Sequence, residues 1–149
     1  MVDIFLILGF LIAVFFVDKI GRYFLQITGF IGMATGLIVL ALSNSSSLFD
    51  GNSLILVFTG FFLFNLSMNA GPNATTFLLS GEVFPPAIRA SGAGLSGAIA
   101  KAGAILGVFL LPILQVKLGI TFLLLGLGIC CLGGALLTYL LRVKVTNSV

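Results

Sequence analysis

Apolar residues fill most of the chain, and charges or turn residues interrupt them at only a few places. These interruptions leave five apolar segments, at residues 4–17, 23–43, 53–79, 90–113 and 119–141. A helix needs about 20 apolar residues to cross the hydrocarbon core of a bilayer, and the last four segments meet that length. Period-two alternation is absent from the sequence, which disfavours a lipid-facing barrel. The pattern predicts an all-α, polytopic membrane protein with about five transmembrane helices.

The composition supports a lipid environment. Of the 149 residues, 60% are hydrophobic and 7% are charged, whereas ordinary globular domains carry about 25% charged residues. The chain contains no histidine, so the usual imidazole ligand and the usual general base are missing. No nucleophile–base pair and no metal-ligating cluster is visible in the sequence. We therefore expect no enzyme activity, no metal, no cofactor and no nucleic-acid partner.

Basic residues predict the orientation of the chain, because cytoplasmic loops of membrane proteins are enriched in Lys and Arg. One side receives five basic residues if every segment crosses: Lys19, Arg22, Arg89, Arg142 and Lys144. The opposite side receives Lys117 alone, together with Asp50 in a Ser/Asn-rich loop. We expect the C-terminus in the cytoplasm, and the cell (plasma) membrane as the location.

The first apolar segment is unlike the others. Residues 4–17 are short for a crossing, and Asp3 rather than a basic region precedes them, which argues against a signal peptide. Five crossings with a short first helix suggest a fragment of a larger protein. A truncated or assembly-dependent membrane protein without transport activity of its own is an alternative that the same observation leaves open.

Three features within the apolar segments are costly in lipid. The first is an amide stripe, Asn65, Asn69 and Asn73, whose members are four residues apart and therefore share one helix face. Buried amides need hydrogen-bond partners or water. The stripe predicts either the polar wall of a cavity, with Asn69 and Asn73 binding a substrate, or hydrogen bonds between helices.

The second feature is Gly71-Pro72 inside the third segment. Proline removes a backbone donor and clashes with the preceding turn, so the helix should kink or break there. Broken membrane helices often form transporter binding sites. A structural kink without a ligand is the competing interpretation.

The third feature is Lys101, about a dozen residues into the fourth segment. A lysine at that depth costs about 2.5–3.5 kcal/mol on insertion scales. No acidic residue lies within the five apolar segments, and Asp3 directly precedes the first of them. We therefore expect Lys101 to bind an anionic substrate or to pair with a carboxylate from a part of the protein outside this chain.

Several motifs together resemble the major facilitator superfamily, and its phosphate:proton symporter family in particular. The sequence Asp18-Lys19-Ile20-Gly21-Arg22 resembles a cytoplasmic loop signature of the superfamily, and Gln26-Ile27-Thr28-Gly29-Phe30 continues it. A longer match runs from Asn69-Ala70-Gly71-Pro72-Asn73 through Gly81-Glu82-Val83-Phe84-Pro85 and Arg89-Ala90-Ser91 to Lys101-Ala102-Gly103. The order and spacing are similar to the tenth and eleventh helices of plant and fungal phosphate transporters.

The resemblance implies that the chain corresponds to helices eight to twelve of a twelve-helix transporter, as part of its C-terminal bundle. It implies a secondary transporter segment that moves inorganic phosphate with protons by alternating access, together with an N-terminal half outside this chain. Asn69 matches an asparagine expected to bond phosphate, and Lys101 matches a lysine of the eleventh helix. A cytoplasmic charge network is implied for Asp18, Gly21, Arg22, Glu82 and Arg89.

The substrate stays open between two kinds of transporter. Sugar porters share the Gly71-Pro72 turn and the Glu82…Arg89 loop, so a sugar or organic-anion porter is the alternative to a phosphate carrier. The expected partners are the lipid bilayer, a small anionic solute, protons and the missing half of the transporter.

Overall fold

The computed structural model describes residues 7, 9, 11, 15, 19–45 and 53–146. Within them the chain forms five helices and no strand: α2 (Arg22–Ser45), α3 (Ser53–Ala70), α4 (Pro72–Val83), α5 (Arg89–Leu118) and α6 (Ile120–Thr146). The all-α fold class is confirmed. The expected segment 4–17 and Asp18 lie outside the described residues, apart from the four isolated positions.

Four spans in the described part are long and apolar enough to cross a membrane: Arg22–Asn44, Leu54–Thr76, Arg89–Leu118 and Ile120–Leu141. Continuous helices suit lipid because they satisfy their backbone groups internally. The chain is therefore an integral membrane protein.

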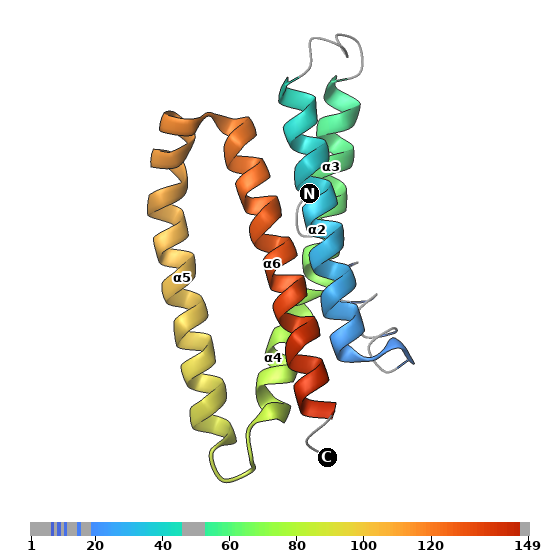
Figure 1. Ribbon diagram of the computed structural model, residues 1–149, viewed down its shortest axis with the longest axis vertical. Coiled ribbons are helices and arrows are strands. Elements are labelled where there is room, and N and C mark those ends of the chain that lie inside the picture. The colour runs from blue at the N-terminus through green and yellow to red at the C-terminus, as the bar shows by residue number, and fades with distance from the viewer. Residues whose placement is uncertain are drawn as a thin grey trace.

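α2 lies between α3 and α6, and α5 stands apart from it (Figure 1). The contacts of α2 are mainly with α3 on one side and α6 on the other, and α4 touches its lower end. The buried apolar residues lie on this helix, at Leu25, Ala34, Leu37 and Ala41, and at Ala135 on α6. The core of the described part is thus a thin α3–α2–α6 layer built largely from small side chains.

Glycines let α2 and α3 approach closely. A Cβ on Gly36 would lie 2.9 Å from the carbonyl oxygen of Gly60, and a Cβ on Gly60 would lie 2.9 Å from that of Gly36. Gly32 lies directly against the Ser67 hydroxyl. Small residues four apart commonly form such close helix contacts in membranes. Gly32 and Gly36 on α2 have this spacing.

The fourth apolar segment, which forms α5, has few neighbours within the described part of the chain. None of the 30 residues of α5 is buried, and nothing within 4 Å would meet a Cβ on Gly94, Gly97, Gly103 or Gly107. The helix stands apart from α2 and α3 in Figure 1, and its contacts are with α4 and α6. These four glycines therefore pack against nothing within the described part of this chain, whereas Gly92, in the first turn of α5, lies against the Phe84 ring.

Candidate functional site

A break interrupts the third segment at Gly71, where sequence reasoning placed a kink or break. α3 ends at Ala70 and α4 begins at Pro72. The Gly71 amide still donates to the Ser67 carbonyl at 3.0 Å, and the Gly71 carbonyl accepts from the amide of Thr75 at 3.0 Å. Pro72 has no amide hydrogen, so the Met68 carbonyl lacks its regular helical donor.

The amide stripe forms a continuous ladder across this break. Asn69 Nδ2 donates to the Asn65 carbonyl at 2.8 Å, and Asn73 Nδ2 donates to Asn69 Oδ1 at 3.0 Å. Asn65 Nδ2 in turn donates to the Phe61 carbonyl at 2.9 Å. The ladder connects the end of α3 to the start of α4, because its last bond joins side chains on the two sides of Gly71.

Asn69 and Asn73 have different surroundings. Asn69 is only 5% exposed, and Gly9 lies so close that a Cβ there would clash with the Asn69 side chain. Both ends of the Asn69 amide are engaged in the ladder. Asn73 is half-buried, and its Oδ1 accepts no hydrogen bond within the described residues. Of the two predicted substrate-binding amides, Asn73 is the one whose carbonyl oxygen is unused within the described part of the chain.

Lys101 is not part of this ladder. It lies about midway along α5 with its side chain exposed, and the side chains of all four acidic residues of the chain lie outside the described part. The hydrogen bonds of Asn69 and Asn73 that the structure gives are to each other and to Asn65. The structure brings the two asparagines together and leaves Lys101 on a separate helix.

The structure describes only some residues of the predicted charge network. Gly21 has φ +89°, a conformation that favours glycine, and its carbonyl accepts the Leu25 amide at 3.1 Å as α2 begins. Arg22 is the first residue of α2 and Arg89 the first of α5, and both helices begin at the lower end of Figure 1. Asp18 and the side chain of Glu82 lie outside the described residues.

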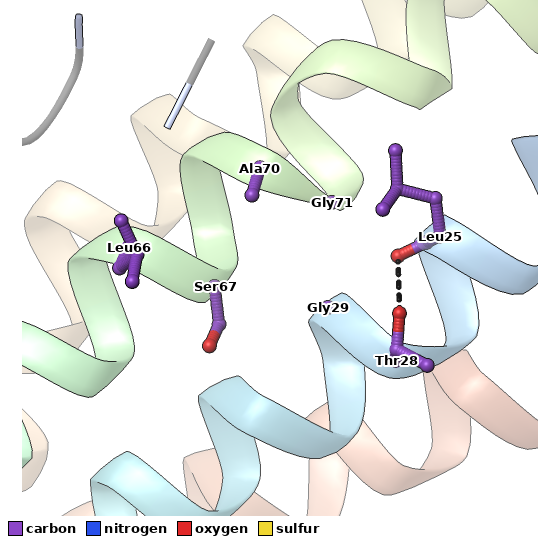
Figure 2. A pocket seen from close by; sticks show the side chains of 7 residues that line it. All are labelled: Leu25, Thr28, Gly29, Leu66, Ser67, Ala70 and Gly71. Carbon is purple, nitrogen blue, oxygen red and sulfur yellow. Dashed lines mark hydrogen bonds between the residues drawn. The ribbon is translucent and has the colours of Figure 1, made fainter. Parts of the chain in front are cut away.

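A small cavity lies beside the break, and sequence reasoning missed it. Its volume is about 150 Å³, and it is lined by Leu25, Thr28, Gly29, Leu66, Ser67, Ala70 and Gly71. Figure 2 shows the Ser67 side chain between α2 and α3 and Thr28 across from it. The signal in the sequence is the run Gly29, Gly32 and Gly36, which marks the face of α2 that meets α3.

Broken apolar helices in a bundle of membrane-spanning helices are typical of secondary transporters. The family model described as "sugar (and other) transporter" matches residues 1–147. The chain belongs to this family, in agreement with the resemblance to the major facilitator superfamily.

The curated relatives to which the chain is similar include phosphate transporters of plants. A probable inorganic phosphate transporter 1-12 of Oryza sativa subsp. japonica is 43% identical over 101 residues, which are 68% of this chain and 18% of that protein. A probable inorganic phosphate transporter 1-10 of the same organism is 37% identical over 142 residues, covering 88% of this chain and 26% of the relative. A low affinity inorganic phosphate transporter 1 of Petunia hybrida is 37% identical over 103 residues. The chain thus spans about a fifth to a quarter of these relatives, and no solved structure matches it.

Proposed function

We propose that this chain is the C-terminal part of a secondary transporter for inorganic phosphate. The observation that carries the proposal is the amide ladder across a broken transmembrane helix, in a chain similar to inorganic phosphate transporters. Amide hydrogens can donate to phosphate oxygens, and the half-buried Asn73 holds an amide at the start of α4, where the helix dipole favours an anion. Asn69 holds Asn73 in this position.

The proposed transporter is completed by helices outside this chain. Lys101 on the uncovered α5 requires an anionic neighbour, and the chain's four acidic residues, Asp3, Asp18, Asp50 and Glu82, supply none within the described spans. The missing N-terminal half supplies a carboxylate, or phosphate itself approaches Lys101. The same scarcity of carboxylates assigns proton coupling, which the symporter resemblance implies, to groups outside this chain.

The proposed setting is the plasma membrane with the C-terminus in the cytoplasm. Arg22 and Arg89 begin helices at one end of the bundle, and α6 ends there (Figure 1). Lys117, in the last turn of α5, lies at the other end. The positive-inside rule then places the end with Arg22 and Arg89 in the cytoplasm.

A second candidate function is a membrane protein that does not transport alone. The observation favouring it is α5, which has no buried residue and an exposed Lys101. A sugar or organic-anion porter is the alternative in substrate, since the family description includes sugars.

Phosphate uptake into proteoliposomes separates these candidates. One sample holds the chain alone, and a second holds a chimera in which residues of this chain replace the matched region of the rice transporter 1-12. We expect radiolabelled phosphate uptake by the chimera that rises with an inward proton gradient and resists competition by hexoses. Uptake by the chain alone would contradict the need for further helices, and competition by a sugar would contradict the substrate.

A further inference from the structure

α2 and α6 pack side by side as an antiparallel pair (Figure 1). At the upper end of this pair, Asn44 Nδ2 donates to Thr121 Oγ1 at 3.0 Å. In its lower half the Phe30 ring lies against Gly134, where a Cβ would be 2.9 Å from Cε1 of that ring. The two contacts are fourteen residues apart on α2 and thirteen apart on α6, so the register between the helices is nearly constant.

The same register brings basic residues of both helices to the lower end of the pair. Arg22 lies eight residues before Phe30, and Arg142 lies eight residues after Gly134. The two arginines therefore occupy facing register positions on α2 and α6. The basic residues at this end are Lys19, Arg22, Arg142 and Lys144, four of the seven in the chain. These four residues form the basic end of the α2–α6 pair.

Positive charge predominates at the basic end. Neither α2 nor α6 contains an acidic residue. Two acidic residues lie near this end in the sequence or the fold: Asp18, directly before Lys19, and Glu82, near the end of α4. If both carboxylates neutralise a basic group, four basic residues against two acidic ones still leave two positive charges. The basic end therefore attracts anions.

Both tyrosines of the chain lie at this end, and the chain has no tryptophan. Tyr23 follows Arg22 in the first turn of α2. Tyr139 precedes Arg142 by three residues on α6, and its side chain is 54% exposed. Tyrosine is enriched where hydrocarbon meets the lipid headgroups, because its ring is apolar and its hydroxyl is polar. The two tyrosines therefore indicate that the basic end lies at the level of the headgroups.

Exposed apolar side chains continue from the basic end along both helices. Phe24 on α2 is 49% exposed, and Leu136 and Leu140 on α6 are 60% and 54% exposed. A phospholipid has the matching arrangement, because its charged phosphate adjoins two acyl chains. A free phosphate ion has no apolar part to cover these side chains. An anionic amphiphile therefore fits this surface better than a soluble anion does.

We propose that the basic end of the α2–α6 pair binds the headgroup of an anionic phospholipid. The lipid phosphate lies among the four basic residues, and the acyl chains lie along the exposed apolar side chains of α2 and α6. Clusters of Lys and Arg at the cytoplasmic ends of membrane helices attract anionic lipids, and the proposed orientation of the chain gives the cytoplasmic leaflet as their source. The binding does not depend on which solute the protein carries.

Tyrosine fluorescence tests the proposal, because both tyrosines lie at the basic end and no tryptophan contributes to the signal. The full chain is reconstituted into phosphatidylcholine vesicles that contain a minor fraction of brominated lipid, with the bromines high on the acyl chains. Bromine quenches fluorescence on contact, so quenching reports which lipid lies beside the tyrosines. We expect brominated phosphatidylserine to quench with an apparent affinity about tenfold above that of brominated phosphatidylcholine. Equal quenching by the two lipids would overturn the proposal, and this comparison needs no variant.

Single charge removals locate the effect. Arg142→Gln and Lys144→Gln should each lower the preference for phosphatidylserine about fivefold. Lys117→Gln is the matched control, because it removes one charge in the last turn of α5, at the other end of the bundle; the preference should be unchanged. Quenching by brominated phosphatidylcholine shows that each variant has inserted.

Two further results would overturn the proposal. An equal loss of preference in Lys117→Gln and Arg142→Gln would show a general effect of net charge rather than a site at the basic end. Loss of the preference when inorganic phosphate replaces chloride at constant ionic strength would show a site for the free anion. We expect the preference to persist in phosphate, because the acyl chains contribute to the binding of a lipid alone.

Discussion

Gly29 of α2 and Gly71 at the helix break meet backbone to backbone: a Cβ on Gly71 would lie 2.6 Å from the Cα of Gly29. A Cβ on Gly29 would likewise lie 2.7 Å from the Cα of Gly71. These contacts involve backbone atoms, which cannot move away as a flexible side chain can. The position of the break against α2 therefore depends on the absence of a side chain at both residues.

Substituting Gly29 with alanine should separate α2 from the break. We expect Gly29→Ala to lower the free energy of unfolding by about 1–3 kcal/mol, the usual cost of overpacking. The measurement is unfolding of the chain in mixed micelles, followed by circular dichroism. Gly126→Ala is the matched control, because nothing within 4 Å meets a Cβ there; its effect should be neutral or slightly stabilising, since alanine is the better helix former. Equal stability of the two variants would contradict the close contact.

Removing the middle of the amide ladder should loosen the break. Asn69→Leu takes away the acceptor of Asn73 Nδ2 and the donor to the Asn65 carbonyl, and membrane hydrogen bonds are worth about 0.6 kcal/mol each on average. We expect a loss of about 1–2 kcal/mol in the same unfolding assay, with faster amide hydrogen exchange at the start of α4. Asn44→Leu, which removes an exposed bond to Thr121, should leave exchange in α4 unchanged. If the ladder does not stabilise the break, amide hydrogen exchange at the start of α4 would be the same in both variants.

Lys101 should hinder insertion of its helix when the chain is expressed alone. Its exposed position on α5 predicts that Lys101→Leu favours insertion by about 2.5–3.5 kcal/mol on the translocon scale. Glycosylation mapping of α5 within a test protein measures this shift. Lys117→Leu, in the last turn of the same helix, should change insertion little because its ammonium can reach the membrane surface. Equal shifts for the two lysines would place Lys101 outside the hydrocarbon.

The orientation has a direct test. A green fluorescent protein fused after Val149 should fluoresce, because the proposed C-terminus is cytoplasmic. A single cysteine at Asn52, in a chain without Cys130 and Cys131, should be labelled from outside intact cells. Labelling at Asn52 only after the cells are permeabilised, with a dark fusion, would invert the proposed topology.

Much of the helical arrangement could be read from the sequence, because in lipid the apolar length of a segment nearly determines its structure. α2 runs from Arg22 to Ser45, against an expected 23–43. α5 continues to Leu118, beyond the expected residue 113, because Pro112 does not end it. The helix ends at Gly119, where φ is +82°. A proline inside a helix and a glycine after it are both breaking signals, and only the backbone path shows which one ends the helix.

The candidate site could be predicted only in part. Spacing by four placed Asn65, Asn69 and Asn73 on one face, as their hydrogen bonds show. Spacing could not tell that Asn69 is buried against Gly9 while Asn73 is only half-buried, because burial depends on which helix covers the face. The separation of Lys101 from the ladder could not be predicted from the sequence for the same reason. It depends on packing between helices, and α5 has few neighbours in the described part of the chain.

Phosphate uptake by the chimera with the rice transporter 1-12 tests the central claim most directly. The comparison is between Lys101→Ala and Asn73→Leu on one side and the matched control Lys117→Ala on the other, each at equal amounts in proteoliposomes. The account predicts that the chimera takes up phosphate. The uptake rate should fall at least tenfold in Lys101→Ala and in Asn73→Leu, and it should be unchanged in Lys117→Ala. A chimera that inserts and folds but carries no phosphate, or full uptake after both Lys101→Ala and Asn73→Leu, would contradict the account.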